Sequence, residues 1–378
     1  MSKVSDSLLP KILYVFGDMS GGGHNLQAFK TIYYSGAADN CVVVSLSDGD
    51  DKTIENKLGE FGLSVIYLNM NKFRLSAAVK ELRRIAAENN CAIAHSNGLK
   101  SDLMCSLAFG KSDTVHIITL HNYLKEDAFL RMSSSKAKIA VSVQKRVLNR
   151  CGHIIACSKT LCSKMLADNP KLRITAIQNG VDIANFVKGD KSALRKQHGV
   201  GEDKIIIIST GRMVPRKRII ETAEAFLNAG LPEKYELWMV GSGECFEEYK
   251  NRFSGEEKIR FLGRRSDIAD LLSMADVFVS SSESEGLPLA VLEAVSAGLP
   301  VYLSDIPQHL EITGEYPDAG KTYTLGNTDE LARLFRGTED YLQNAQTVSL
   351  EGGPFDITVM GDSYRDYYIE AARQEVKK

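Results

Sequence analysis

The sequence predicts an α/β protein made of two doubly wound parallel-sheet domains, and three observations support this prediction. Short apolar runs bounded by turn residues alternate with helical periodicity along the whole chain. The pattern breaks near residues 179–182, and a polar, charged stretch follows up to Lys204. The length of 378 residues suits two domains of ordinary size. We therefore expect an N-terminal domain over residues 1–185, a C-terminal domain over 186–355 and a final segment over 356–378.

In the N-terminal domain, the apolar runs predict strands with helices between most of them. Residues 75–85 illustrate the helical pattern, because their leucine, valine and isoleucine side chains fall on one stripe that can pack on a sheet. The expected strands are residues 12–16, 41–46, 65–68, 92–95, 115–120, 154–157 and 174–177.

The C-terminal domain opens with residues 204–209, whose run of isoleucines is typical of a strand buried on both faces. Further strands are expected at residues 236–240, 259–262, 277–280 and 301–303. A last helix is expected over residues 361–372, where three tyrosines and Ala371 lie near one face.

The composition is that of an ordinary soluble protein, with 44% hydrophobic and 25% charged residues. This excludes collagen-like and disordered classes, and no run approaches the roughly 18 apolar residues of a membrane span. The first sixteen residues have no secretory signal pattern. Seven cysteines without CxxC spacing indicate reduced thiols, neither disulfides nor a zinc site. We expect a cytoplasmic protein.

Charge is distributed unevenly along the chain. Residues 1–185 hold 23 Lys and Arg against 16 Asp and Glu, a balance of +7, whereas the remainder holds 23 against 32, or −9. Residues 128–167 contain no acid at all and eight basic residues. Such a face could contact an anionic lipid surface or an anionic acceptor. A solvated helix face is the alternative, and no nucleic-acid partner is expected.

In doubly wound sheets, ligands bind beyond the carboxyl ends of the strands, so the loops there are the candidate sites. After the first strand, residues 17–25 include three adjacent glycines, Gly21, Gly22 and Gly23, which would let a phosphate approach the backbone. Their spacing does not complete a dinucleotide motif, and a plain tight turn is equally consistent.

A cationic loop follows the first strand of the C-terminal domain. It contains Arg212, Arg216, Lys217 and Arg218, four cations within seven residues at the start of a helix. A helix N-terminus already carries partial positive charge, so this clustering is unfavourable unless an anion binds there. A diphosphate would suit the planar fork of an arginine and the point charge of a lysine. A solvated basic turn is the alternative.

Carboxylates and one histidine occupy two further loops. Glu285 precedes a helix, and Glu293 lies within an otherwise apolar part of that helix, so its burial requires a partner such as a ribose hydroxyl. His121 follows a predicted strand of the N-terminal domain, and a purely structural role is the alternative interpretation for a single histidine. The acidic residues 48–51 read as a surface turn rather than a metal site.

Taken together, these residues resemble the retaining glycosyltransferases of family 4, which have the GT-B fold. The resemblance covers essentially the whole chain. It rests chiefly on Glu285-x7-Glu293, Arg212-x4-Lys217, Ala275-Asp276-Val277 leading into Ser280-Ser281-Ser282, and Ala297-Gly298-Leu299-Pro300-Val301. The glycine loop, His121, Asn179-Gly180-Val181-Asp182 and Gly241-Ser242-Gly243 follow in the family's order.

The resemblance implies two Rossmann-like domains that face a central cleft, with a C-terminal helix that crosses back to the N-terminal domain. It also implies that Arg212 and Lys217 hold the diphosphate of a nucleotide-sugar donor, with Gly22 contacting the phosphate from the other domain. Such enzymes need neither a metal nor another cofactor, because the two cations stabilise the leaving diphosphate.

The remaining roles concern the sugar and the nucleoside. The resemblance implies that Glu285, with the backbone at Gly286 and Leu287, meets the donor sugar and that Glu293 binds the nucleotide ribose. His121 would lie beside the transferred sugar, and His121 and Glu285 are the candidate catalytic residues. Two departures leave the shape of the sugar pocket open. Arg218 stands where the family often has glycine, and Leu287-Pro288 stands where Phe-Gly is more frequent.

We therefore expect a retaining hexosyltransferase that moves a hexose or N-acetylhexosamine, from a UDP-sugar by preference, to a glycan or lipid-linked acceptor in bacterial cell-surface polysaccharide synthesis. Residues 128–167 suggest an acceptor at the cytoplasmic face of the inner membrane. A GT-B epimerase or hydrolase acting on the nucleotide sugar and a catalytically silent scaffold protein are the alternatives. A nicotinamide dehydrogenase is disfavoured, because the spacing of the glycines does not complete a dinucleotide-binding motif.

Overall fold

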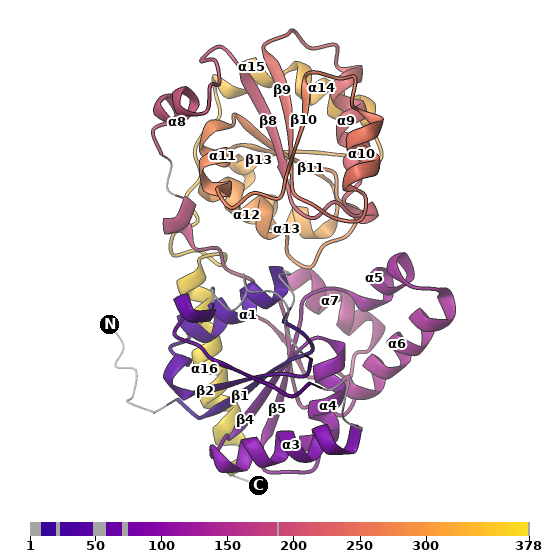
Figure 1. Cartoon of the computed structure of the whole chain (residues 1–378), viewed down its shortest axis with the longest axis vertical. Coiled ribbons are helices and arrows are strands. Elements are labelled where there is room, and N and C mark those ends of the chain that lie inside the picture. Colours follow the sequence, from indigo (N-terminus) through magenta and orange to yellow (C-terminus); the bar gives the residue numbers. More distant parts are fainter. Residues whose placement is uncertain (1–8, 20–22, 48–57, 70–74, 187–188, 377–378) are drawn as a thin grey trace. The chain divides into compact units, whose positions relative to one another are not determined.

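The computed structural model describes residues 9–19, 23–47, 58–69, 75–186 and 189–376. The chain divides into two compact units (Figure 1). Unit 1 comprises Met1–Gly180 and Ile357–Lys378, and unit 2 comprises Val181–Asp356. The first division falls at Gly180 rather than at the expected residue 185, because the short 3-10 helix Ile183–Phe186 packs against helices of unit 2.

Unit 1 contains a fully parallel seven-stranded sheet in the order β3-β2-β1-β4-β5-β6-β7. Its strands are β1 (Ile12–Phe16), β2 (Cys41–Ser45), β3 (Val65–Tyr67), β4 (Ile93–Asn97), β5 (Val115–Leu120), β6 (His153–Ala156) and β7 (Ile174–Ala176). The register places Phe16 beside Asn97, and Asn97 beside Thr119. The carboxyl ends of β1, β4 and β5 therefore lie side by side at one edge of the sheet. The strand order reverses between β1 and β4, because β2 and β3 follow on the β1 side and β5, β6 and β7 follow on the β4 side.

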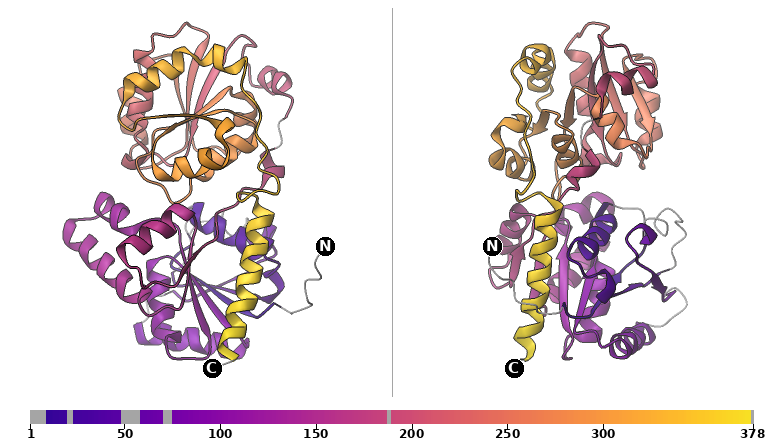
Figure 2. Two further views of the ribbon diagram at one scale, coloured as in Figure 1. Left: turned by 180° about the vertical axis from the view of Figure 1, so that it is seen from behind. Right: turned by 90° about the vertical axis from the view of Figure 1, so that its left-hand side faces the viewer.

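Helices cover both faces of this sheet. The helices described in unit 1 are α1 (Gly23–Tyr34), α3 (Leu75–Glu88), α4 (Leu99–Phe109), α5 (Leu124–Arg131), α6 (Ser134–Leu148), α7 (Lys159–Asp168) and α16 (Ile357–Val376). One hydrophobic core joins the sheet to α1 and α16, and a second joins it to α3 and α4. Figure 2 shows α16, in yellow, running along unit 1.

The C-terminal helix α16 is an integral part of unit 1. Tyr364 and Tyr368 are buried, and the Tyr368 hydroxyl lies 2.8 Å from Nδ1 of the buried His95. Gly361 packs directly on α1, since a Cβ at this position would collide with the carbonyl oxygen of Tyr34. The 3.6-residue spacing of apolar side chains in the sequence thus reflects real packing on the N-terminal sheet.

Unit 2 contains a parallel six-stranded sheet in the order β10-β9-β8-β11-β12-β13. Its strands are β8 (Ile205–Thr210), β9 (Tyr235–Val240), β10 (Ile259–Gly263), β11 (Val277–Ser280), β12 (Val301–Ser304) and β13 (Gly320–Tyr323). The strand β13 is not predicted from the sequence pattern, because this edge strand is short and its central residues are polar and exposed.

The helices described in unit 2 are α8 (Lys191–Gln197), α9 (Ile219–Asn228), α10 (Phe246–Arg252), α11 (Ile268–Met274), α12 (Leu289–Ser296), α13 (Pro307–Glu315), α14 (Thr328–Arg336) and α15 (Thr338–Leu342). Residues of α9 and α14 form one hydrophobic core with the sheet, and α12 packs on β11 and β12. None of the helices in the described ranges is long and apolar enough to cross a bilayer.

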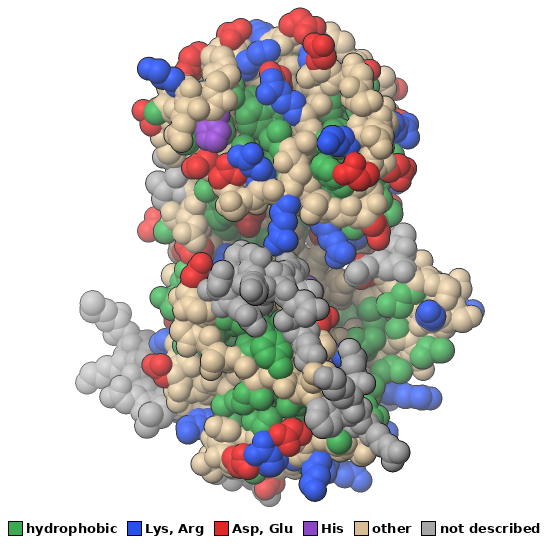
Figure 3. Space-filling model, in the orientation of Figure 1, with side chains coloured by type: hydrophobic (Ala, Val, Ile, Leu, Met, Phe, Trp, Pro, Cys, Tyr) green, Lys and Arg blue, Asp and Glu red, His purple; other side chains and the backbone are tan. Residues whose placement is uncertain are grey.

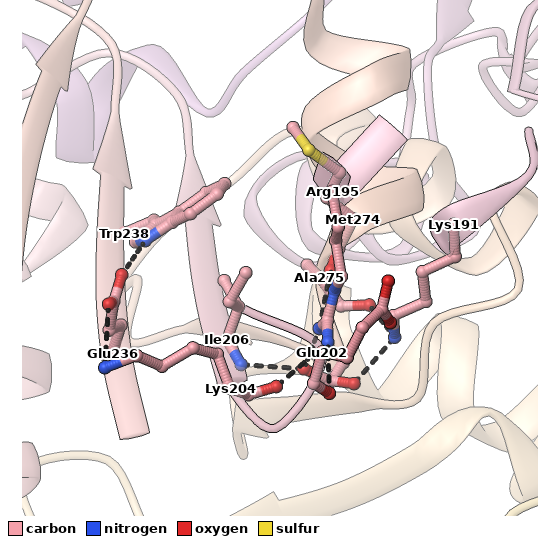
Figure 4. Close-up of polar contacts among 10 residues, drawn as sticks. Lys191, Arg195, Glu202, Lys204, Ile206, Glu236, Trp238, Met274 and Ala275 are labelled. Carbon is pink, nitrogen blue, oxygen red and sulfur yellow. Dashed lines mark hydrogen bonds and ion pairs between the residues drawn. The ribbon is translucent and has the colours of Figure 1, made fainter. Parts of the chain in front are cut away.

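A buried ionic network ties α8 to the sheet of unit 2 (Figure 4). The Arg195 guanidinium donates to the carbonyl of Met274 at 2.9 Å and to Oδ2 of Asp276 at 2.8 Å. Asp276 also accepts from the backbone N–H of Ile206 at 2.7 Å and from Lys191 at 2.6 Å. The Ala275-Asp276-Val277 phrase, which contributes to the family resemblance, therefore has a structural role at the amino end of β11.

Candidate functional site

The candidate site of unit 2 lies between the neighbouring strands β8 and β11. The strand order reverses at this point, because β9 and β10 follow on the β8 side and β12 and β13 follow on the β11 side. Such a switch point leaves a crevice at the carboxyl ends of the strands, which is the usual ligand site of doubly wound sheets. A pocket is present there, lined by Ser209–Arg212, Lys217, Ile219, Val240, Ser280–Ser282, Pro288, Ala290 and Val291. Residues from two of the candidate loops, the cationic loop and the segment that follows β11, thus meet at one place.

The backbone carrying Arg212 is held in place by the loop after β9. Gly211 donates its N–H to Val240 at 2.9 Å, and Met213 donates to Ser242 at 3.0 Å. Gly241 has φ +140°, and a Cβ there would collide with the carbonyl oxygen of Gly211. The Gly241-Ser242-Gly243 turn is therefore required because two backbones approach more closely than a side chain permits.

The cationic loop binds the carboxylate that the sequence analysis assigns to the sugar. Lys217 Nζ lies 2.5 Å from Oε1 of Glu285, and Arg216 Nη1 lies 2.9 Å from Oε2. Only 6% of the Glu285 side chain is exposed. Burial by itself would raise the pKa of this carboxyl group, but the two cations and their hydrogen bonds hold the pKa of Glu285 well below its usual range. Glu285 is therefore an anion at neutral pH and cannot serve as a proton donor.

Arg212 differs from its two neighbours in the loop. Its side chain is exposed at the pocket, and within the described ranges no hydrogen bond or ion pair involves its guanidinium group. Lys217 also lines the pocket, with 16% of its side chain exposed. The site thus combines one solvent-facing guanidinium with one ammonium that is held by a carboxylate, and an anion could meet both.

The other residues that the sequence predicts for this site occupy the segment from the end of β11 to α12. Gly286 is half-buried, whereas the side chain of Leu287 is buried, so only the Leu287 backbone could meet a ligand. Glu293 is half-buried on α12, three residues after Ala290, which lines the pocket. Glu293 is not itself among the residues that line the pocket in the described structure.

Arg218 explains one departure from the family pattern. It adopts the left-handed conformation, with φ +47° and ψ +39°, which suits the glycine that is frequent there. Its side chain donates to Glu221 at 2.5 Å and to Glu283 at 3.4 Å. Arg218 is thus committed to two carboxylates, unlike Arg212, which faces the pocket.

Sequence reasoning misses a layer of polar groups beneath the pocket. Ser304 donates its hydroxyl to the carbonyl of Ser282 at 2.6 Å. The fully buried His309 bonds the carbonyl of Ser304 through Nδ1 at 2.9 Å. Burial lowers the pKa of His309 to about 4, and the nearby Glu285 carboxylate only partly offsets this effect. Nothing in the local sequence pattern distinguishes this histidine from a surface residue of α13.

In unit 1, His121 lies at the carboxyl end of β5, as the sequence predicts. Its Nε2 lies 2.5 Å from Oδ1 of Asn97, the last residue of β4. Burial, with a smaller contribution from His24, lowers the pKa of His121 to about 3, so that the ring is neutral at physiological pH. Gly22, assigned to the donor phosphate, and residues 48–51 lie outside the described residues.

The acid-free segment, residues 128–167, does not form one continuous basic face. Its β6 part belongs to the buried sheet, and Lys164 pairs with Glu126 while lying 4.5 Å from the centre of the Tyr123 ring. Exposed basic side chains gather on α6, namely those of Lys136, Lys138, Lys145 and Arg146, beside the exposed apolar residues Phe129, Met132 and Ile139. Figure 3 shows green and blue side chains on this part of unit 1.

In the part of the chain that the structure describes, no three His, Cys, Asp or Glu side chains gather in a way that could hold a metal ion.

Comparison with known proteins agrees with this architecture. The family model described as Glycosyltransferase Family 4 matches residues 36–185, and the one described as Glycosyl transferases group 1 matches residues 190–339. The chain is 26% identical to the UDP-Gal:alpha-D-GlcNAc-diphosphoundecaprenol alpha-1,3-galactosyltransferase of Escherichia coli, over 84% of this chain and 85% of that protein. It is 23% identical to the O-antigen biosynthesis glycosyltransferase WclY of E. coli, over 80% and 82%.

Among solved structures, Anabaena HepE in complex with UDP-glucose superposes with a TM-score of 0.75 at 20% identity, covering 97% of this chain and 98% of that one. This likeness establishes the GT-B fold for the two Rossmann-like units. Together, the two family models account for most of both units and meet within four residues of one another. The chain belongs to glycosyltransferase family 4.

Proposed function

We propose that the protein is a retaining hexosyltransferase that uses a UDP-sugar and a glycan or lipid-linked acceptor in bacterial cell-surface polysaccharide synthesis (O-antigen, capsule or exopolysaccharide). The observation that carries the proposal is the cluster of Arg212, Lys217 and Glu285 at the switch point of unit 2. The names of the E. coli relatives and the UDP-glucose complex of HepE support the substrate classes.

In this proposal, Arg212 and Lys217 bind the donor diphosphate. Negative charge grows on the diphosphate as the glycosidic bond breaks, and fixed cations stabilise that charge without reorganisation. The same two side chains supply the role that a divalent metal has in other transferases, so the reaction is proposed to be metal-independent. The anionic Glu285 would accept hydrogen bonds from sugar hydroxyls, and the backbone N–H groups of Gly286 and Leu287 would donate hydrogen bonds to sugar oxygens.

Retention is proposed to follow from attack on the same face that the diphosphate leaves, with a donor phosphate oxygen taking the proton of the acceptor hydroxyl. Glu285 is held ionised by Lys217 and Arg216, so its part would be to orient the sugar and to stabilise positive charge at the anomeric carbon. Glu293 would bind the ribose, and it lies on α12, two of whose residues, Ala290 and Val291, line the pocket.

The first experiment is a thermal-shift screen of UDP-, GDP- and ADP-sugars, because a ligand that binds only the folded protein raises its melting temperature. Turnover is then measured with the selected donor. Arg212→Ala and Lys217→Ala should each lower kcat by about a hundredfold or more. Arg252→Ala is the matched control, because this arginine of unit 2 does not line the pocket, forms an exposed pair with Glu224 and lies over the Phe253 ring. Near wild-type rates in both site variants would refute the diphosphate assignment.

Two further measurements separate the finer claims. Glu293→Ala should weaken binding of free UDP, and unchanged UDP affinity would exclude its ribose role. A chelator should leave turnover intact, whereas a strict requirement for a divalent ion would contradict the metal-free mechanism. Release of free sugar without any acceptor, at the rate seen with one, would identify a nucleotide-sugar hydrolase instead.

The acceptor is proposed to be presented at an anionic membrane surface. The exposed cations of α6 and the exposed apolar side chains of Phe129, Met132 and Ile139 provide the charge and the apolar contact that such binding needs. The variant K136E/K138E should lose flotation with phosphatidylglycerol vesicles, whereas Lys111→Glu, an exposed lysine after α4, should not. Equal flotation of wild type with neutral phosphatidylcholine vesicles would refute the electrostatic part.

A further inference from the structure

A chain of side-chain amides runs along the carboxyl edge of the unit 1 sheet. Asn25, in the first turn of α1, donates from Nδ2 to the backbone carbonyl of Asp18 at 3.1 Å. Asn97, at the end of β4, donates from Nδ2 to Oδ1 of Asn25 at 3.1 Å. The Oδ1 atom of Asn97 then lies 2.5 Å from Nε2 of His121. Asn25 and Asn97 are 1% and 2% exposed, so water cannot replace these contacts readily.

The direction of this chain is fixed at its first member. A backbone carbonyl oxygen can only accept a hydrogen bond, so the group of Asn25 that faces Asp18 must be its NH2. The Oδ1 of Asn25 therefore faces Asn97, which must present its own NH2 there and its Oδ1 to His121. Because that oxygen also can only accept, Nε2 of His121 must carry the ring proton.

The other ring nitrogen is left as an acceptor. A neutral imidazole has one proton, so Nδ1 of His121 has a free lone pair. This atom is buried, and no hydrogen-bond partner for it exists among the residues that the structure describes. A buried acceptor without a donor is costly, and a position at a strand's carboxyl end places it where ligands of this fold bind.

We propose that Asn25 and Asn97 are positioning residues that hold His121 in its Nε2–H tautomer, so that Nδ1 accepts a hydrogen bond from a ligand hydroxyl. The proposal rests on the proposed function, because the hydroxyl belongs either to the transferred sugar or to the acceptor glycan. It assigns His121 the role of an acceptor and excludes that of a proton donor.

The tautomer is tested without any substrate. The 15N shifts of the imidazole nitrogens, assigned by comparison with His121→Gln, should show a bare Nδ1 and a protonated Nε2 from pH 5 to 8. Asn97→Leu removes the acceptor and should mix or reverse the tautomers, whereas Asn97→Asp keeps an acceptor and should preserve them. A charged ring or a protonated Nδ1 at pH 7 in the wild type would overturn the proposal, whatever reaction the protein catalyses.

The ligand is tested by comparing UDP, UDP-glucose and UDP-galactose in titration calorimetry. If the hydroxyl is on the donor sugar, Asn97→Leu should weaken the UDP-sugar by about five- to tenfold and leave UDP unchanged, which is the range of one hydrogen bond. If it is on the acceptor, the KM for the acceptor should rise instead while UDP-sugar affinity stays constant. Unchanged donor affinity together with unchanged acceptor KM would refute the ligand role.

A matched control and a pH profile complete the test. Asn149→Leu removes another amide-to-amide contact of unit 1, an exposed 2.6 Å bond with Asn169, and should change none of these readouts. Asn97→Asp places a carboxylate beside the ring and should move the acid limb of kcat/KM to higher pH, since protonation of Nδ1 abolishes the acceptor. If His121 has the expected tautomer but the protein transfers no sugar, the roles of Asn25 and Asn97 as positioning residues stand. Only the proposed function is then refuted.

Discussion

Replacing Asp276 by asparagine should lower the free energy of unfolding of unit 2 and leave turnover unchanged. Asp276 joins Lys191, Arg195 and the backbone of Ile206, and the Arg195 and Asp276 side chains are 4% and 14% exposed. The substitution keeps the shape of the side chain and removes its charge. The Arg195 cation then remains buried without a counter-charge.

Removing one partner of a buried ion pair typically costs about 3–5 kcal/mol. Arg195 keeps its hydrogen bonds to the carbonyls of Met274, Glu202 and Lys204, which soften the loss. We therefore expect a decrease of about 3 kcal/mol in the free energy of unfolding of unit 2. That is a large part of the roughly 5–15 kcal/mol by which folded domains are stable.

Urea unfolding followed by tryptophan fluorescence measures this change, because Trp238 on β9 is the single tryptophan of the chain and reports unit 2. Asp267→Asn is the control, since the Asp267 pair with Arg265 is more exposed and should contribute less than about 1 kcal/mol. Turnover at low temperature should be unchanged in both variants. A loss below about 1 kcal/mol in Asp276→Asn, or lost turnover at full stability, would refute the reasoning.

Three other outcomes are expected. Gly241→Ala should lower both stability and turnover, because its Cβ meets the carbonyl of Gly211 and displaces the loop of the diphosphate site; wild-type kinetics would contradict this. Arg218→Gly should be more stable than Arg218→Ala by about 1 kcal/mol. Both variants lose the guanidinium, and only alanine is strained by the left-handed backbone conformation at this position. Equal urea midpoints for the two variants would exclude that strain. The pKa of His309 is about 4 in the folded state against about 6.5 unfolded, so the unfolded state binds the extra proton between these values. Stability reported by Trp238 should therefore fall as the pH drops from about 6.5 toward 4, by up to about 1.4 kcal/mol per pH unit, and His309→Gln should flatten this dependence.

Much of the fold is readable from the sequence because burial leaves a strong periodic signal. The run at residues 204–209 predicts a strand buried on both faces, and β8 is the central strand of its sheet. The edge strand β13 escapes detection, since half of its residues face solvent and their pattern resembles a loop. Strand ends are also uncertain, as β4 extends to Asn97 rather than His95.

The candidate site is predicted in part for a similar reason. Charges that cluster beside a helix start are conspicuous, so Arg212, Lys217 and Glu285 could be selected, and the structure brings the cationic loop and the Glu285 segment together. Asn97 and His309 could not be selected, because single polar residues within apolar elements acquire their meaning only through neighbours distant in sequence. Arg216 was visible as a charge, but its bond to Glu285 was not.

The position of α16 has a consequence for biogenesis. The core of unit 1 includes Tyr364 and Tyr368, which leave the ribosome only after the whole of unit 2 has been synthesised. The sheet of unit 1 must therefore remain partly uncovered until α16, which follows unit 2 in the chain, has been synthesised. Chains that stop before Ile357 would lack this cover and should be prone to aggregation and degradation.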